Sequence, residues 1–341
     1  MKVWTSLRAY RPDASKPLIL ALGNFDGVHR GHLAILNPVA EHARRLRRIP
    51  AVLTFAEHPQ RVLHPGIGPG LLTSPQHRLL IFSKIGIEMC FLLPFTQEFA
   101  QTRPEEFVRE ALVNRLQVKE IHLGYNAHFG FNREGNVALM KALSGRLGFQ
   151  FYEAQPVSVD SQFISSTLIR KAIMEGDFER AARFLGRPFS IFASVVRGKG
   201  RGKTLGFPSA NLRPHSEIFP PRGVYPVQVR ENRFHLKPLG PEEFEFQSEI
   251  PGPWWQGVLN FGVRPTFEDS GLEVPEVHIL DYSGGDLLGK TVEVVLYPRL
   301  REEISFVDSQ ALAEAIRQDI VLARRFFNGN KSLQSEKTSI Y

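Results

Sequence analysis

The ten residues at 23–32 constrain the fold of this chain more than any other segment. They read Gly23-Asn24-Phe25-Asp26-Gly27-Val28-His29-Arg30-Gly31-His32. An apolar run at 18–22 precedes them, and a helical pattern follows directly. In an open α/β sheet, ligands bind beyond the carboxyl ends of the strands, where the free N–H groups of a helix N-terminus bind phosphate. We therefore expect a nucleotide-phosphate site in this turn, with contacts from Gly23, Asn24, Phe25, Asp26, Gly27 and Gly31.

The two histidines of this turn are the candidate catalytic residues. His29 and His32 flank Gly31, so both imidazoles can hydrogen-bond the negative charge that builds as an α-phosphorus is attacked. No protein nucleophile is then required. The alternative, two surface caps at a helix start, fits less well with the order strand, glycines, helix.

The first half of the chain has the pattern of a doubly wound α/β domain. Short β-like runs alternate with helical patterns from residue 18 to about residue 185. The expected strands are Leu18 to Leu22, Ala51 to Phe55, Glu88 to Leu93, Glu120 to Leu123 and Phe151 to Ala154. With 341 residues, the chain is long enough for two domains.

The pattern changes at Gly186-Arg187-Pro188. Clusters of glycine and proline then separate runs that predict an antiparallel barrel, at 189–196, 224–229, 257–261, 274–280 and 291–297. A terminal helix is expected from Ser309 to Phe327, with Leu312, Ile316, Ile320 and Phe327 among its buried residues. We place the domains at 1–186 and 187–330, and expect residues 331–341 to form a disordered tail.

Composition and charge narrow the class of protein. Hydrophobic residues make up 43% and charged residues 23%, which is typical of a globular protein. The apolar runs are far shorter than the ~20 residues of a membrane span, and the N-terminus does not resemble a secretory signal, so we expect a cytoplasmic protein without a membrane partner. The net charge of +7 does not by itself distinguish nucleotides from nucleic acid as partners. The arginines at 44–48 lie at a helix C-terminus and complement its dipole, so no nucleic-acid partner is expected.

A second phosphate-binding candidate is the segment at 164–170, Ile-Ser-Ser-Thr-Leu-Ile-Arg. Its hydroxyls, from Ser165, Ser166 and Thr167, precede a helix and can donate to phosphate oxygens. Arg170 lies one turn inside and offers a forked cation for a leaving pyrophosphate. A plain helix cap is the alternative. Together with the first turn, this segment resembles the nucleotidylyltransferase superfamily, which uses a His-x-Gly-His pair and a Ser/Thr-rich segment with a basic residue on ATP.

Four blocks in order make the first half similar to the FMN adenylyltransferase module of bacterial FAD synthetases. They are GNFDGVHRGH, LTFAEHP at 53–59, LGYNAHFGFNREG at 123–135 and ISSTLIR at 164–170. The resemblance implies nucleotide contacts from His58, Pro59 and Asn126. An unliganded loop histidine is the alternative for His58. The third block departs from the commoner form, with Ala127 where an aromatic residue is usual and His128 where arginine is frequent.

A glycine-rich basic loop marks the second half. The run VVRGKGRGKTLGFPSANL begins at residue 195. Backbone N–H groups and positive charge there can wrap a polyphosphate, although the spacing is not that of a GxxxxGK[ST] loop. The alternative is a mobile basic linker. The candidate nucleotide contacts are Gly198, Gly200, Arg201, Gly202, Lys203, Gly206 and Pro208.

The second half resembles the riboflavin kinase module, whose fold is a six-stranded antiparallel barrel. The resemblance lies in PSAN at 208–211, PPRGVY, GVLNFGVRPTF and EVHILD. It implies Mg²⁺ ligation by Ser209 and Asn211, and a catalytic base at Glu276, with Glu268 and Glu273 as nearby decoys. The segment between Arg230 and Gly257 is longer than the usual hairpin. We expect a surface insertion there, packed on the barrel by its tryptophans.

The two resemblances together imply one function. The C-terminal domain is expected to phosphorylate riboflavin with ATP, and the N-terminal domain to adenylylate FMN to FAD with release of pyrophosphate. Riboflavin, FMN and ATP are the expected partners, with Mg²⁺ as the metal, and the oligomeric state is open. One alternative is an adenylyltransferase for another small phosphorylated substrate with a non-catalytic barrel. The other is a basic nucleic-acid-binding regulator with inactive nucleotide folds.

Overall fold

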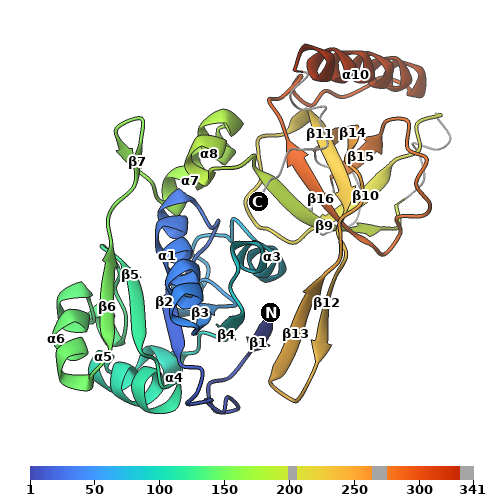
Figure 1. Ribbon diagram of the computed structural model, residues 1–341. Helices are drawn as coiled ribbons and strands as arrows, with labels where there is room; N and C mark the ends of the chain where they lie inside the picture. Colours follow the sequence, from blue (N-terminus) through green and yellow to red (C-terminus); the bar gives the residue numbers. More distant parts are fainter. Residues whose placement is uncertain (199–205, 263–274, 331–341) are drawn as a thin grey trace. The chain divides into compact units, whose positions relative to one another are not determined.

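The chain packs into two compact units (Figure 1). The computed structural model describes residues 1–198, 206–262 and 275–330. Unit 1 comprises Met1–Ser166 and Phe234–Gln247, and unit 2 comprises Thr167–Arg233 with the described residues from Ser248 onward. The packing boundary therefore precedes the residue 186/187 division expected from sequence. The reason is α8 (Phe178–Leu185), whose Phe178 ring packs against Phe189 and Tyr225 of unit 2.

Unit 1 is built on an eight-stranded sheet in the order β12-β13-β1-β4-β3-β2-β5-β6. Six of these strands are mutually parallel: β1 Lys2–Trp4, β2 Leu18–Leu22, β3 Ile49–Phe55, β4 Met89–Leu93, β5 Glu120–Gly124 and β6 Gln150–Ala154. The predicted doubly wound α/β fold is confirmed. Every residue of β2 is buried, as expected for a strand covered on both faces.

Helices cover both faces of this sheet. On one face, α1 (Arg30–Leu46) packs against β2, β3 and β5. Its apolar residues recur at helical spacing and form one side of the helix, so residues such as Leu36 and Val39 are buried. On the other face, Leu20 of β2 shares a core with Phe107 and Leu112. The remaining elements before unit 2 are α2 Pro59–Leu63, α3 Pro75–Ile85, α4 Gln97–Ala100, α5 Pro104–Glu106, η1 Phe107–Arg115, η2 Phe131–Arg133, α6 Val137–Leu147, β7 Ser158–Val159 and β8 Gln162–Phe163.

A hairpin from the second half of the sequence extends this sheet. Its strands are β12 (Phe234–Pro238) and β13 (Glu243–Ser248), and β13 pairs antiparallel with β1, with Val3 opposite Phe244. The backbone N–H of Phe246 donates to Met1 O at 2.8 Å, and the Phe246 side chain is only 2% exposed. Apart from Phe246 the strand residues of the hairpin are exposed or half-buried, so it lies at the surface as expected, but it pairs with β1. The hairpin supplies hydrogen-bond partners that the edge of β1 would otherwise lack.

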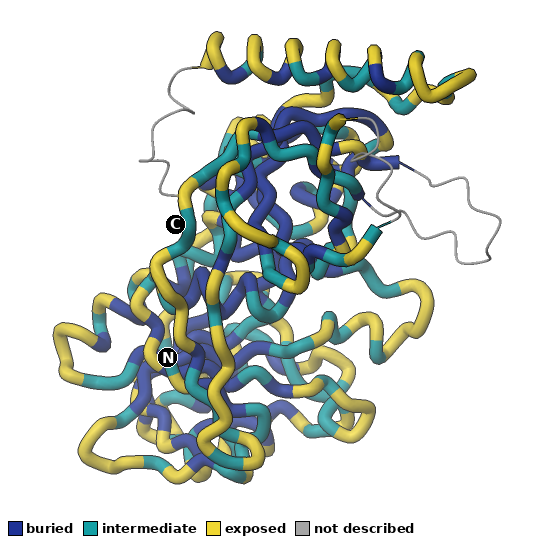
Figure 2. Tube along the Cα trace, turned by 90° about the vertical axis from the view of Figure 1, so that its right-hand side faces the viewer, coloured by how far each residue is buried: buried dark blue, intermediate teal, exposed yellow. Residues whose placement is uncertain are grey.

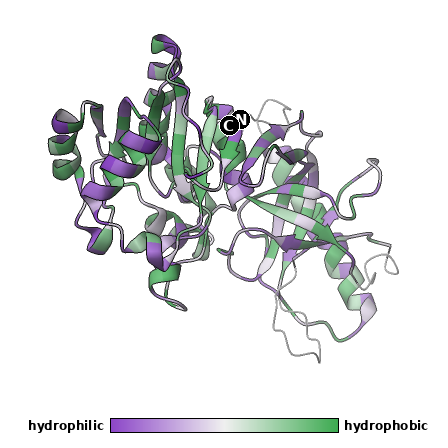
Figure 3. Cartoon of the chain, turned by 90° about the horizontal axis from the view of Figure 1, so that it is seen from below, coloured by the Kyte–Doolittle hydropathy of each residue, from purple (hydrophilic) through white to green (hydrophobic). Residues whose placement is uncertain are grey.

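Unit 2 contains a closed antiparallel barrel in the order β10-β15-β14-β11-β16-β9, which confirms the predicted six-stranded barrel. Its strands are β9 Ser190–Val196, β10 Ala210–Pro214, β11 Gly223–Glu231, β14 Trp255–Phe261, β15 Glu276–Ile279 and β16 Thr291–Leu296. Most residues of the barrel strands are buried, as the colouring of Figure 2 shows. In both units the hydrophobic residues concentrate on the strands (Figure 3). The expected packing of the tryptophans is confirmed, since the Arg230 guanidinium lies 4.3 Å from the Trp254 ring and Trp255 contacts Tyr282.

In the part of unit 2 that the structure describes, three helices accompany the barrel: α7 Ser166–Met174, α8, and the terminal α10 Ser309–Gly329. The terminal helix was predicted, and its exposed residues follow its outer side in Figure 2. Phe327 is fully buried, as expected, while Leu312, Ile316 and Ile320 are half-buried. An unpredicted ion pair adds to this packing, because buried Asp319 accepts two 2.7 Å hydrogen bonds from Arg301. Among the described residues, no helix combines the length and apolarity required to cross a membrane.

Candidate active sites

The structure brings three predicted segments of unit 1 to one edge of the sheet. Strand β2 lies between β3 and β5, so the three carboxyl ends are adjacent. The turn at 23–32 follows β2, the His58-Pro59 pair follows β3, and Asn126 follows β5. This edge lies where the strand order changes direction, which is where open α/β sheets bind ligands.

The two histidines form a stacked pair at the start of α1. Their ring centroids are 3.6 Å apart and the planes differ by 17°. His29 is the N-cap of the helix, and its Nδ1 accepts a hydrogen bond from the backbone N–H of His32 at 3.2 Å. Because Nδ1 is an acceptor, a neutral His29 carries its proton on Nε2, where it can donate. The stack lets the two imidazoles present donors side by side.

Close approach explains one of the glycines in this turn. A Cβ at Gly31 would lie 3.1 Å from the His29 ring, so any side chain there would displace that imidazole. Asn24 contributes a different feature. Its Oδ1 is buried and has no hydrogen-bond partner among the described residues, which suits a donor from a bound ligand.

Two other side chains of the turn point into the protein. Phe25 is fully buried and packs against Phe82 and His32. Asp26 is 1% exposed, and its carboxylate accepts hydrogen bonds from the backbone N–H groups of Leu72 and Thr73 at 3.0–3.1 Å. A ligand would therefore meet only the backbone at these two positions.

Sequence reasoning missed Arg78, which connects two of the loops at this edge. The residue is 1% exposed and lies on α3. One of its terminal nitrogens donates to Asn24 O at 3.0 Å, and the other donates to Phe55 O at 2.8 Å and Ala56 O at 3.1 Å. A buried arginine that donates to three carbonyls fixes the loops after β2 and β3. The only available signal was a single charge directly before the apolar run at 79–82.

The Ser/Thr-rich segment also reaches the turn. The hydroxyl of Ser166 donates to Asp26 O at 3.0 Å, so these two predicted motifs are in contact. Ser165 directly precedes it and is half-buried. Thr167 and Arg170 lie on α7, beyond the packing boundary of unit 1, and Arg170 is 9% exposed.

The remaining predicted contacts of unit 1 lie in two loops. His58 caps α2, its Nδ1 accepting from the backbone of Gln60 at 3.3 Å, and Pro59 is the first helical residue. In the other loop, Asn126 is exposed. Ala127 packs against the core, whereas His128 is exposed and donates from Nδ1 to Arg133 O at 3.2 Å. The two unusual residues of this block are thus one core residue and one loop-stabilising residue.

The second site lies on neighbouring strands of the barrel. Asn211 of β10 stands directly opposite Glu276 of β15. The Ser209 hydroxyl donates to Glu276 Oε1, while the other carboxylate oxygen has no partner among the described residues. Three oxygen-bearing side chains expected from sequence therefore converge. Their donor set, a hydroxyl, an amide and a carboxylate, suits a hard divalent cation.

The glycine-rich loop begins and ends beside this cluster. A Cβ at Gly198 would lie 1.8 Å from Asn211 Nδ2, so only glycine fits there. Gly206 follows with φ +85°, and Pro208 O accepts a 2.8 Å hydrogen bond from His278 Nδ1. His278 was not predicted. The expected contacts Gly200, Arg201, Gly202 and Lys203, and the decoys Glu268 and Glu273, lie outside the described residues.

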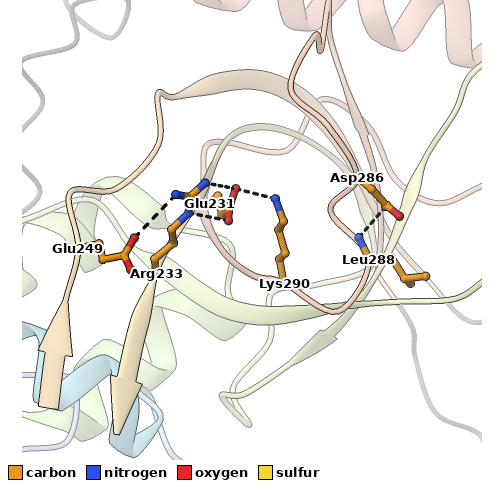
Figure 4. A network of polar contacts seen from close by, with 6 residues as sticks. All are labelled: Glu231, Arg233, Glu249, Asp286, Leu288 and Lys290. Carbon is orange, nitrogen blue, oxygen red and sulfur yellow. Dashed lines mark hydrogen bonds and ion pairs between the residues drawn. The ribbon is translucent and has the colours of Figure 1, made fainter. Parts of the chain in front are cut away.

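A separate charged group in unit 2 is structural (Figure 4). Glu231 accepts hydrogen bonds from Arg233 at 2.9 Å and Lys290 at 3.0 Å, and Arg233 also faces Glu249 at 3.7 Å. The hydrogen bond from Arg233 is the main cause that lowers the pKa of Glu231. Exposed pairs of this kind contribute little to stability, because solvent screens them. They join the end of β11 to the residue before β16.

Two protein families match this chain, one in each half. The family described as FAD synthetase matches residues 11–168, and the family described as riboflavin kinase matches residues 185–327. The matched ranges contain the turn at 23–32 and the cluster of Ser209, Asn211 and Glu276, whereas Arg170 lies between the two ranges.

Similar proteins cover nearly the whole chain. The bifunctional riboflavin kinase/FMN adenylyltransferase of Haemophilus influenzae is 35% identical over 91% of this chain and 94% of its own length. The protein of that name from Escherichia coli K12 is 34% identical over 92% of this chain and 94% of its own length. A crystal structure described as a macrolide-efflux protein from Streptococcus pneumoniae matches with a TM-score of 0.75, at 27% identity over 94% of this chain and 98% of that one.

Proposed function

The chain belongs to the family of bifunctional riboflavin kinases/FMN adenylyltransferases, and from that premise we propose that its two sites catalyse consecutive ATP-dependent reactions. The barrel transfers a phosphoryl group from ATP to riboflavin, which yields FMN. The site of unit 1 transfers the adenylyl group of a second ATP to FMN, which yields FAD and pyrophosphate. The observation that carries the proposal is that each half holds an assembled set of the predicted groups: His29 with His32, and Glu276 with Ser209 and Asn211.

In unit 1, the proposed chemistry is charge stabilisation. The stacked imidazoles hydrogen-bond the phosphate oxygens as negative charge develops on the α-phosphorus attacked by FMN. The backbone of the turn and the start of α1 hold the polyphosphate, and the hydroxyls of Ser165 and Ser166 bind the leaving pyrophosphate. The expected pyrophosphate contacts of Thr167 and Arg170 stay predictions. Arg78 and Asp26 act as positioning residues, because they hold the loops without exposing their charges.

In the barrel, Glu276 is the proposed general base. A carboxylate there can take the proton from the 5′-hydroxyl of riboflavin as that oxygen attacks the γ-phosphorus. The hydrogen bond from Ser209 orients this carboxylate and leaves its second oxygen available. Gly198 lets the backbone approach Asn211, because a side chain at this position would overlap the asparagine amide.

Mg²⁺ is the proposed metal of this site, with Ser209 and Asn211 as its protein ligands. Their hydroxyl and amide oxygens suit that ion, which takes few protein ligands when it is carried by nucleotide phosphates. When bound, it would neutralise charge on the transferred phosphoryl group. The cytoplasmic location, the absence of nucleic-acid and membrane partners, and the domain limits stay predictions.

Two variants of the full chain test the assignment of each reaction to its site. Incubation of the purified protein with riboflavin, ATP and Mg²⁺ should give FMN and FAD, separated by chromatography. Glu276→Gln should abolish FMN formation from riboflavin while FAD still forms from supplied FMN. His29→Ala should make FMN accumulate, since it impairs only the second reaction. Loss of both activities in either folded variant would contradict two independent sites, and absence of both products in the wild type would exclude the proposal.

The alternatives predict different results in the same assay. An adenylyltransferase for another substrate would leave riboflavin unchanged. A regulator with inactive folds would turn over no flavin and would instead bind RNA with strong salt dependence.

A further inference from the structure

A buried cluster of two histidines and one glutamate lies away from the nucleotide site of unit 1. Glu120 and His122 are two residues apart on β5, so their side chains share one face of the sheet. His42 comes from α1, which packs on β5. It follows His29 by 13 residues along that helix. At the helical rise, this corresponds to roughly 20 Å, so the cluster cannot share ligands with the phosphates.

The three side chains converge on one carboxylate oxygen. Glu120 Oε1 lies 2.7 Å from His42 Nδ1 and 2.6 Å from His122 Nε2. One ligand atom from each of the three residues lies within 4.8 Å of the other two. Tyr152 holds both rings, stacking on His122 at 4.9 Å and meeting His42 edge-on at 5.2 Å. The three donors are thus fixed by a helix, a strand and an aromatic contact.

The carboxylate of this cluster is not fully satisfied. The Glu120 side chain is 0% exposed, and its second oxygen, Oε2, is buried without a hydrogen-bond partner in the described part of the chain. An unpaired buried acceptor of this kind is costly unless a cation or donor fills it. His42 remains 20% exposed, which gives an ion or water access to the cluster from solvent.

No lysine or arginine among the described residues balances this charge. Burial would raise the pKa of Glu120, but hydrogen bonds from His122 and His42, together with their charges, outweigh it and hold the pKa below its usual range. A metal ion held by these three side chains would compensate the negative charge of the buried carboxylate. Imidazole nitrogens and a carboxylate are the ligands that Zn²⁺ and similar ions take.

We propose that His42, Glu120 and His122 form a structural site for a transition-metal dication of the Zn²⁺ class, which fastens the C-terminal part of α1 to β5. The separation of the ligand atoms must then grow modestly. Two ligands at about 2.0–2.2 Å from a tetrahedral ion stand roughly 3.4 Å apart, which small side-chain rotations can supply. Binding displaces any proton shared between the carboxylate and the imidazoles. The ion stabilises the helix that begins with the catalytic histidines, and it takes no part in either transfer reaction.

The experiment is a metal titration of the full chain. The protein is stripped with a chelator and titrated with Zn²⁺ by calorimetry, without nucleotide, in two buffers of different ionisation enthalpy. We expect one tight equivalent with proton release, d–d absorption bands of low coordination number when Co²⁺ replaces Zn²⁺, and a higher melting temperature with the metal.

Two sets of variants separate this cluster from the other histidines. His42→Ala removes the most exposed ligand, so the variant should still fold. It should weaken Zn²⁺ binding by more than about 100-fold, because loss of a direct ligand costs more than loss of a group that only supports a ligand. Glu120→Gln should lose the Co²⁺ bands as well. His32→Ala, which alters the other histidine pair of the unit, and His235→Ala, on β12, should bind one equivalent as the wild type does.

Other outcomes overturn the proposal. If the wild type binds no Zn²⁺, or if His42→Ala binds it as tightly as the wild type, the cluster is only a hydrogen-bonded ion pair. If binding is lost in His32→Ala but kept in His42→Ala, the metal occupies the nucleotide site instead. Flavin turnover is not the readout, so these results stand apart from the test of the two reactions.

Discussion

In unit 1 the two site histidines stand three residues apart in one turn of the chain. In unit 2, Ser209, directly before β10, and Glu276 of β15 stand 67 residues apart and meet through a hydrogen bond. The interactions that hold the two sites in place also differ. The turn of unit 1 is held by buried side chains from elsewhere, since Arg78 reaches Asn24 across 54 residues. The barrel site is held by the backbone ladder that sets Asn211 opposite Glu276.

This difference indicates where each site is vulnerable. A local motif can keep every one of its residues and still lose its shape when a distant buried charge is removed. A site placed by a closed ladder keeps its backbone when a side chain changes, because each strand is paired on both sides. Four predictions use this contrast, from the largest expected effect to the smallest.

Replacement of Arg78 by Met should have the largest effect. It leaves the carbonyls of Asn24, Phe55 and Ala56 without their buried donor and should lower the stability of unit 1 by on the order of 3–5 kcal/mol. FAD formation should fall about 100-fold, because small displacements of catalytic groups are that costly. Separate assays of the two reactions and denaturant unfolding measure both effects. Arg146→Met, at an exposed position of α6, is the control, and an equal loss of FMN formation would contradict the contrast between the sites.

The hairpin tests which unit its strands stabilise. Phe246→Ala removes a ring that is 2% exposed and should cost on the order of 3 kcal/mol. The midpoint of inactivation in denaturant should fall for FAD formation and stay unchanged for FMN formation. Phe163→Ala, at a ring that is 62% exposed, should change neither. A shift confined to the kinase reaction would assign the hairpin to the barrel instead.

Ser209 tests the chemistry of the barrel site without disturbing its ladder. Ser209→Ala removes a hydroxyl that bonds a carboxylate and should lower FMN formation by about 10- to 100-fold, with unchanged unfolding. Ser209→Thr restores the hydroxyl and should recover most of the rate. If Ser209→Thr formed FMN no faster than Ser209→Ala, the hydroxyl would have no role in metal binding or in orienting the base.

The smallest effect concerns the pH dependence of unit 2. Burial, with a smaller effect from Arg213, lowers the pKa of His215, whose Nε2 lies 2.8 Å from the Ser194 hydroxyl. The unfolded chain therefore binds this proton more readily than the folded one, so stability is present above about pH 6.5 and falls as the pH drops below it. Unfolding at a series of pH values should show a shallower acid loss in His215→Gln than in the wild type. The exposed His235→Gln control should leave the slope unchanged.

Much of the fold followed from local patterns. The strands β2 to β6 and the start of α1 were predicted because a buried strand is a short apolar run and an amphipathic helix has apolar residues at helical spacing. Both patterns can be recognised in consecutive residues. Strand β1 was not predicted because it has only three residues, and β10 was not predicted because its sequence, ANLRP, contains no apolar run. The pairing of the hairpin β12–β13 with β1 was not predicted, because the two segments lie more than 230 residues apart in the sequence.

The candidate sites divide in the same way. The sequence by itself determined which residues are the candidates for the chemistry, such as His29, His32 and Glu276, because their types and spacing lie within short motifs. Only the tertiary structure decided that Asp26 faces inward, that Arg78 joins two loops and that His42 meets Glu120. The physical reason is that burial and hydrogen-bond partners are set by segments distant in the chain, whereas propensity and motif spacing are properties of neighbours.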